Sequence, residues 1–292
     1  MIIVRFQGGL GNQMLQRAFM EYVRKFDDNV VADLSEYNGV SYHNGYELID
    51  VFDTTVRNAR WIDTIKSSGR ARVSHYTKLG LYINSYLNKK RKKNVDSYIS
   101  EHLFYTLSDE TIALKLKSNK VLYFDGFWPH KYMYDTFPAT ELFVFKDEII
   151  EMCEEKAKEI KSENSCSIHV RLGDYIGSEF DCINSDYYRR AIEIIKDRCG
   201  NVKFYVFSDD VTKAKSYLDD DDNIIFMNEK YACSGCDMYL MSLCNNNIIA
   251  NSTFSFWGAK LNCNTSKIVV APKQYSADLE FIQAKEEGWM VI

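Results

Sequence analysis

The C-terminal half of the chain alternates short apolar runs with stretches of helical periodicity. The apolar runs cover residues 167–171, 202–207, 223–227, 247–250 and 267–271. The stretches with helical periodicity cover about 186–199, 211–218, 236–244 and 253–261. This alternation predicts a parallel β-sheet covered by helices on both faces. Ligands of such sheets bind outside the carboxyl ends of the strands, so the residues that follow each run are the candidate site residues.

A second sheet is expected in the N-terminal half. The apolar run 1–6 leads into a glycine-rich turn at 7–13, which is followed by apolar positions with helical spacing. Residues 30–33 and 121–125 are further candidate strands. Weak periodicity between 42 and 132 favours helices with irregular connections.

The length of 292 residues allows two α/β domains, which we place at 1–145 and 146–292 with a linker near 137–148. No apolar run approaches the ~18 residues that cross a bilayer, and the first residues lack the features of a signal peptide. We therefore expect a cytoplasmic protein. The net charge of −5 argues against a nucleic-acid partner.

One segment departs from this acidic balance. Residues 57–94 carry eleven Lys or Arg and a single acid, Asp63, which gives a local charge of 11 − 1 = +10. Five of these cations are consecutive, namely Lys89, Lys90, Arg91, Lys92 and Lys93. Such a run predicts peripheral contact with an anionic inner membrane face or a lipid-diphosphate-linked acceptor. The alternative is an ordinary solvated surface.

The eight cysteines predict free thiols, because the chain has no secretory signal and can build its own cores. The spacing of Cys233 and Cys236 resembles half of a zinc site, but no second closely spaced pair follows. We expect no metal there.

The first strand of the C-terminal half ends in a polar motif. Period-two alternation puts His169 and Arg171 on one face of that strand. A buried strand with an imidazole and a guanidinium on one face normally needs an anion or a carboxylate beside them. The alternative is a structural ion pair with an acid such as Asp174.

The next strand ends at Ser208, Asp209 and Asp210. Two adjacent carboxylates fit either a divalent metal or the paired N–H donors of a guanine edge. A helix cap explains one of the two aspartates equally well.

The strand at 247–250 is followed by Asn251, Ser252, Thr253, Phe254 and Ser255, where a helix is expected to begin. Backbone N–H groups and hydroxyls at a helix N-terminus form an anion site that suits a pyrophosphate. Capping alone needs only one of those hydroxyls.

The N-terminal glycine turn invites comparison with a dinucleotide-binding fingerprint, with Asp33 lying 24 residues after Gly9. The fingerprint fails, because Met14 stands where the third glycine is required. What remains is a tight loop whose Asn12 and Gln13 side chains are expected to face a ligand.

Four motifs occur in order along nearly the whole chain: GGLGNQM at 8–14, HVRLGDY at 169–175, FSDD at 207–210 and NSTFSFWGA at 251–259. With them the chain resembles the bacterial α-1,2-fucosyltransferase family and, more distantly, the α-1,6- and protein O-fucosyltransferases. The resemblance implies a GT-B fold of two Rossmann-like domains facing a cleft. The N-terminal domain would be the acceptor side, the C-terminal domain would bind GDP-fucose, and the last residues would pack back on the N-terminal domain.

The resemblance also implies an inverting, metal-independent transfer of fucose to the 2-hydroxyl of a terminal β-galactoside, with no cofactor beyond the nucleotide sugar. Matching positions imply that His169 and Asp209 hold guanine and that Arg171 holds the β-phosphate. The family commonly has a second arginine where this chain has Leu172. Further donor contacts fall on Asn12, Gln13, Ser208, Asp210 and residues 251–255.

The general base implied by the resemblance is Glu179, which lies ten residues after His169. Asp174 and His130 are alternatives. Trp128, His130 and Lys131 follow the strand at 121–125 and are assigned to the acceptor.

The chemistry agrees with the residues themselves. Cleavage of the sugar–phosphate bond builds charge on the departing diphosphate, which a guanidinium and helix-terminal amides can stabilise. An inverting transfer then needs a group that accepts the proton of the attacking hydroxyl. Two other functions stay open at this point, a transferase with another donor or linkage and an NAD(P)-linked oxidoreductase that uses Asp33.

Overall fold

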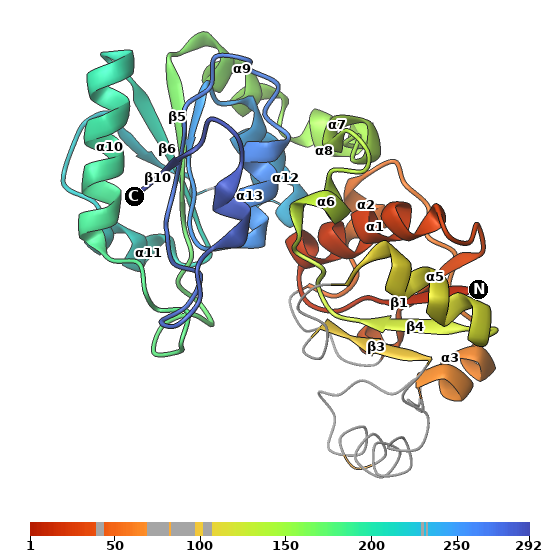
Figure 1. Ribbon diagram of the computed structural model, residues 1–292. Helices are drawn as coiled ribbons and strands as arrows, with labels where there is room; N and C mark the ends of the chain where they lie inside the picture. The colour runs from red at the N-terminus through yellow and green to blue at the C-terminus, as the bar shows by residue number, and fades with distance from the viewer. Residues whose placement is uncertain (39–43, 69–81, 83–96, 102–106, 229–230, 232) are drawn as a thin grey trace. The chain divides into compact units, whose positions relative to one another are not determined.

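The computed structural model describes residues 1–38, 44–68, 82, 97–101, 107–228, 231 and 233–292. The chain divides into two compact units, Met1–Val144 and Phe145–Ile292. Each unit is built on its own parallel sheet (Figure 1).

The sheet of the first unit has the strand order β2-β1-β4-β3, and all its pairs are parallel. Its strands are β1 (Ile2–Arg5), β2 (Val30–Asp33), β3 (Tyr98–Ser100) and β4 (Leu122–Asp125). The long helix α1 (Leu10–Arg24) packs on β1 and β2. It starts after Gly8, whose positive φ of 79° suits only glycine at the exit of β1.

The remaining elements of the first unit are short. They are η1 (Ser35–Tyr37), α2 (Leu48–Val51), α3 (Trp61–Ser68), α5 (Asp109–Ser118), α6 (Lys131–Tyr134) and α7 (Ala139–Leu142). The expectation of helices and irregular connections between 42 and 132 was incomplete, because it missed β3. This edge strand has three residues and is paired along β4, which leaves too few positions for a periodic signal.

The sheet of the second unit has the order β10-β9-β8-β5-β6-β7. Its strands are β5 (Ser165–Val170), β6 (Lys203–Ser208), β7 (Ile224–Phe226), β8 (Asn246–Ile248), β9 (Val269–Ala271) and β10 (Met290–Val291). All its pairs are parallel, which confirms the sheet predicted from the five apolar runs.

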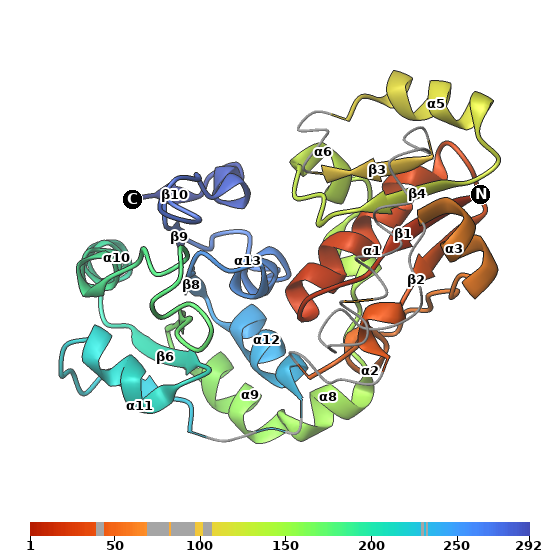
Figure 2. The ribbon, with the colours of Figure 1, turned by 90° about the horizontal axis from the view of Figure 1, so that it is seen from below.

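Helices cover both faces of this sheet (Figure 2). They are α8 (Asp147–Met152), α9 (Glu154–Ser162), α10 (Ser185–Cys199), α11 (Val211–Ala214), η3 (Lys215–Tyr217), α12 (Ser234–Leu243), α13 (Thr253–Lys260) and η4 (Ile282–Lys285). On one face Ile168 and Val170 pack with Tyr188 and Ala191 of α10. The opposite face, covered by α12 and α13, receives the alternate residues of β5, and His169 is among them.

The last strand, β10, lies at the edge of the second sheet, where Met290 and Val291 pair with β9. Packing of the last residues on the first domain, which the resemblance implied, stays a prediction. Two residues are too few to show strand periodicity, so only the pairing identifies them.

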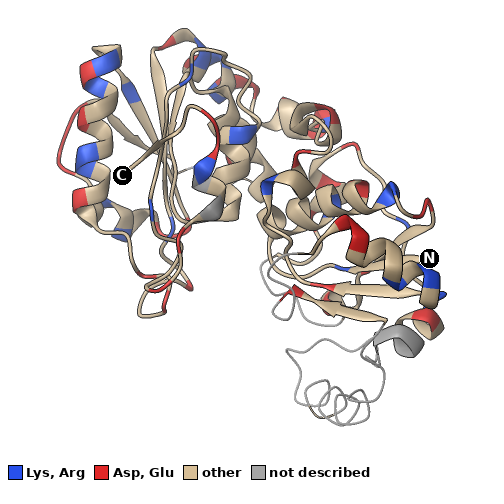
Figure 3. Cartoon of the chain, in the orientation of Figure 1, with Lys and Arg blue, Asp and Glu red and all other residues tan. Residues whose placement is uncertain are grey.

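The basic run Lys89–Lys93 lies outside the described residues, and the membrane contact assigned to it stays a prediction. In the rest of the chain, cations and acids are interspersed on both units (Figure 3). None of the helices that the structure describes is both long and apolar enough to cross a bilayer.

Candidate active site

His169 is a buried candidate side chain near the end of β5. It is 5% exposed, and its ring lies 5.5 Å from that of Phe254 at the start of α13. Burial lowers the pKa of His169 to about 4; the charge of Asp209 opposes this shift and that of Arg171 adds to it. The imidazole is therefore neutral at physiological pH, and its Nδ1 has no hydrogen-bond partner among the described residues.

Arg171 lies between two carboxylates. Its Nη1 is 2.9 Å from Oδ2 of Asp209, and its Nη2 donates to Oδ1 of Asp174 at 2.5 Å. The other oxygen of Asp209 accepts from the Leu172 amide at 2.9 Å. A Cβ on Gly173 would lie 2.5 Å from Asp209 Oδ2, so this close approach needs glycine. The ion pair with Asp174 is thus present, and Asp209 links the Arg171 guanidinium to the Leu172 backbone.

The contacts of Asp209 do not test the role expected for it at the guanine edge. They use two of the about four acceptor positions of the carboxylate, and the side chain is 27% exposed, so that role stays a prediction. Asp210 is the helix cap, because it accepts from the Lys213 amide at 3.0 Å, and this bond lowers its pKa. Ser208 Oγ accepts from the Asp210 amide.

The segment after β8 divides into structural and available groups. Asn251 is buried, and its amide donates to the carbonyls of Phe180 and Tyr275 at 2.9 and 2.7 Å. Ser255 is also buried and bonds within its own turn. Because these hydrogen bonds are made within the protein, the side chains of Asn251 and Ser255 are not available for the donor contact expected of them. Ser252 caps α13 by accepting from the Phe254 amide, and Thr253 is half-buried at the helix start.

Asp237 was missed by the sequence analysis. It lies in the first turn of α12, which runs from β7 to β8 and therefore starts at the carboxyl edge of the sheet. Among the described residues its carboxylate has no recorded partner, and burial raises its pKa to about 6. Its helix packs beside α13, where a Cβ on Gly258 would meet Met241 Cε at 2.8 Å. Asp237 is thus a half-buried acid with a raised pKa at the same edge and on the same face as His169.

The glycine loop of the first unit contains one available side chain and one structural side chain. Gln13 is fully buried; its Nε2 donates to the Gly8 and Gly45 carbonyls, and its Oε1 accepts from the Glu47 and Leu48 amides. All of its hydrogen-bonding capacity is used, so the Gln13 side chain is not available for the donor contact expected of it. Asn12 is half-buried in the first turn of α1.

The three residues assigned to the acceptor differ in how exposed they are. Trp128 is fully buried and stacks on Phe19 at 4.7 Å, so its ring is part of the core and the acceptor contact predicted for it is wrong. His130 is half-buried beside Tyr132, with ring centroids 5.8 Å apart. Lys131 is exposed and pairs with Asp135 at 2.6 Å.

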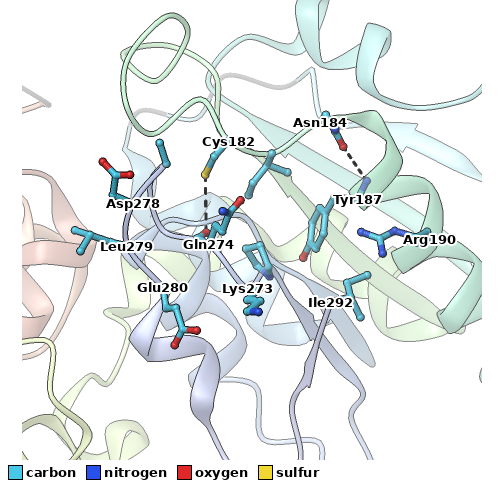
Figure 4. A pocket seen from close by; sticks show the side chains of 13 residues that line it. Cys182, Asn184, Tyr187, Arg190, Lys273, Gln274, Asp278, Leu279, Glu280 and Ile292 are labelled. Carbon is cyan, nitrogen blue, oxygen red and sulfur yellow. Dashed lines mark hydrogen bonds between the residues drawn. The ribbon is translucent and has the colours of Figure 1, made fainter.

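Glu179 is exposed on the turn after β5, and its backbone carbonyl accepts from the Ala277 amide at 3.0 Å. Behind this turn lies a cavity of about 470 Å³ (Figure 4). Its walls include Cys182, Tyr187, Arg190 and Lys273. Because it lies on the α10 face of the sheet, it is separate from the face that carries His169.

Asp33, on which the oxidoreductase alternative depends, is fully buried. It accepts from Tyr123 Oη at 2.7 Å and from the Ser35 amide at 3.0 Å. A carboxylate enclosed in this way cannot reach a ribose hydroxyl, so the geometry disfavours a dinucleotide function.

All eight cysteines are free. Cys233 and Cys236 flank the start of α12, and Cys153 Sγ lies 3.9 Å from the Cys236 carbonyl. The hydrogen bond with Cys153 and burial raise the pKa of Cys236 to about 12, against the opposing effect of Cys233, and this keeps the thiol protonated. An inert thiol of this kind has no assigned role in the site.

The two Rossmann-like parallel units, with polar motifs at the carboxyl ends of their strands, define a GT-B-type glycosyltransferase fold. Among solved structures the chain is similar to the fucosyltransferase NodZ from Bradyrhizobium, with a TM-score of 0.51, 13% identity and coverage of 88% of this chain and 92% of that one. It is also similar to POFUT1 in complex with GDP, with a TM-score of 0.52, 11% identity and coverage of 92% and 98%.

The chain belongs to glycosyl transferase family 11, whose family model matches residues 1–292. Its relatives include the O-antigen biosynthesis glycosyltransferase WbnK of Escherichia coli, which is 31% identical over 306 residues and covered over 97% of both chains. An alpha-1,2-colitosyltransferase of Escherichia coli is 27% identical over 307 residues, covering 100% of this chain and 98% of that one. These findings confirm the family resemblance and the fold drawn from the four motifs.

Proposed function

We propose that this family 11 glycosyltransferase moves L-fucose from GDP-fucose to the 2-hydroxyl of a terminal β-galactoside, with inversion and without a metal. The 1,2-linkage in the name of the colitosyltransferase relative supports a 2-hydroxyl acceptor. That relative also favours one alternative donor, the nucleotide sugar of colitose, which is the 3-deoxy analogue of fucose.

The observation that carries the guanine assignment is the placement of His169 and Asp237 at one edge of the sheet. His169 Nδ1 has no partner among the described residues, and Asp237 is a half-buried acid with a raised pKa. Guanine presents two adjacent N–H donors on one edge and acceptors on the other. The carboxylate of Asp237 would accept from the N–H edge. The neutral imidazole of His169 would donate its N–H to one of the acceptors of guanine. We therefore assign to Asp237 the guanine contact first expected of Asp209.

Arg171 and the start of α13 are assigned to the diphosphate. A guanidinium offers five N–H donors in a fixed fork, which matches two phosphate oxygens at once. Asp174 is 40% exposed on a turn, so its carboxylate can leave Arg171 when a diphosphate arrives. The first amides of α13 and Thr253 add donors on the adjacent strand end.

Donor identity is tested by thermal unfolding with nucleotides. GDP at about 100 times its Kd should stabilise the protein by about 2.7 kcal/mol. For a chain of this size that corresponds to a rise of about 5 °C in Tm. UDP and NAD should give no rise, since neither carries the guanine edge. A rise with NAD and none with GDP would contradict the transferase assignment, and faster turnover of GDP-colitose than of GDP-fucose would select the alternative donor.

The general base is assigned to Glu179, with Asp174 and His130 as the competing groups. Glu179→Gln removes the proton acceptor while keeping size and polarity, so kcat should fall about a hundredfold, within the usual range for general-base catalysis. Initial rates at saturating donor and acceptor measure this. Asp174→Asn is the matched comparison, because it lies on the same turn. Full transfer by Glu179→Gln would eliminate Glu179 as the base.

A further inference from the structure

The loop that leaves β4 presents one aromatic side chain to solvent. Phe127 is 37% exposed, whereas its neighbours Gly126 and Trp128 are buried. It lies at the carboxyl edge of the first unit's sheet, two residues after Asp125, the last residue of β4. An aromatic ring at this edge is available to a ligand.

Three neighbours hold Phe127 in this position. Its amide donates to Glu101 Oε2 at 2.6 Å, just beyond the end of β3. Gly126 has no room for a side chain, because a Cβ there would lie 2.5 Å from Glu101 Cβ. Trp128 adopts a left-handed conformation with φ 56°, which turns its indole into the core against Phe19. The buried indole fixes the chain direction, so the preceding ring of Phe127 points outward.

This loop is also tied to the glycine loop. Gln16 of α1 is fully buried; it exchanges hydrogen bonds with the Gln7 backbone at 3.0 and 3.3 Å and donates to the Gly126 carbonyl at 3.4 Å. Gln7 precedes the turn that carries Asn12, so one side chain fixes the loops that follow the neighbouring strands β1 and β4. Phe127 is thereby placed next to the loop that carries Asn12, for which a donor contact is expected.

We propose that Phe127 is the platform for a pyranose ring of the acceptor saccharide. Each pyranose has a face of C–H groups, which gains dispersion contact and loses water when it lies on an aromatic ring. His130 follows on the same loop and can bond the hydroxyls at the rim of such a sugar. The inference rests on the proposed transfer to a glycan and replaces the acceptor contact first assigned to Trp128.

The test compares Phe127→Ala, Phe127→Tyr and Phe137→Ala. Phe137 is the matched control, since it is 47% exposed in the same unit but lies beyond α6. Phe127→Ala should raise KM for a β-galactoside-terminated oligosaccharide about tenfold, with kcat and KM for the donor within twofold of wild type. Phe127→Tyr keeps the ring and should restore the acceptor KM, and Phe137→Ala should match wild type.

A second readout, binding of the oligosaccharide without donor, is followed by NMR titration. The Kd should rise about tenfold in Phe127→Ala and in neither of the other two variants. An unchanged Kd in Phe127→Ala would overturn the platform whatever happens to transfer. If the wild type binds the saccharide through Phe127 yet transfers nothing from GDP-fucose, the donor assignment fails and the platform stands.

Discussion

Arg171→Lys is expected to lower kcat at least a hundredfold, a loss of about 2.7 kcal/mol of transition-state stabilisation. Lysine keeps the positive charge but offers a single ammonium in place of a planar fork, so it cannot bond two phosphate oxygens in one geometry. The developing charge on the leaving diphosphate is the largest electrostatic demand of the reaction. Initial rates at saturating donor and acceptor measure the loss, and thermal unfolding checks that the variant is folded.

Arg189→Lys is the matched control, because Arg189 forms an exposed pair with Asp186 on α10. It should retain wild-type rates, since exposed pairs contribute little. Turnover of Arg171→Lys within tenfold of wild type would remove Arg171 from the assigned role.

EDTA should leave the wild-type rate of transfer unchanged. A loss of activity in EDTA that Mn²⁺ or Mg²⁺ restores would make Asp209 and Asp210 metal ligands instead.

The affinity for GDP-fucose is expected to rise about tenfold between pH 5 and pH 7 because Asp237 must be ionised to accept from guanine. Its pKa of about 6 leaves about one tenth of the protein ionised at pH 5. His169, with a pKa of about 4, stays neutral over this range. GDP-fucose is the probe rather than GDP, whose terminal phosphate itself titrates near pH 6. Calorimetric titration measures the affinities.

Asp237→Asn should abolish that pH dependence and weaken binding at pH 7.5 by about 10- to 100-fold, since hydrogen bonds to charged groups contribute about 1.5–3 kcal/mol. The substitution should not destabilise the fold. Because the pKa of Asp237 is raised in the folded state, its ionisation lowers the free energy of unfolding as pH rises from about 4 through 6. The amide variant should therefore unfold at or above the wild-type Tm at pH 7.5. Asp186→Asn, also in a first helical turn, is the control. An unaltered pH profile in Asp237→Asn would exclude Asp237 from the guanine contact.

The strands and helices of the second unit could be predicted because each of the longer parallel strands is buried on both faces and reads as an apolar run. The strands β3 and β10 could not, since three and two residues carry no periodicity. Only the pairing of Met290 with Val270 identifies β10, and it depends on a contact between two separate segments of the chain.

The site divides in the same way. His169, Arg171 and the start of α13 could be placed from the sequence, because they follow strands directly and the carboxyl ends of parallel strands share one edge. Asp237 carries no such signal. It stands inside a helix, and what distinguishes it is that the packing of α12 half-buries its carboxylate and raises its pKa.

The sequence by itself determined the class of fold, the family and the strand ends at which chemistry occurs, since these follow from local periodicity and from short motifs at fixed positions. Only the tertiary structure decided which polar groups are free to act. Gln13 and Asn251 have types and positions that suit a ligand, but neighbours brought in from distant segments use up the hydrogen bonds of their side chains. The adjacent Phe127 and Trp128 differ in exposure because one left-handed residue turns the second ring inward. Availability is a property of packing and of hydrogen-bond partners, and neither is encoded at the residue itself.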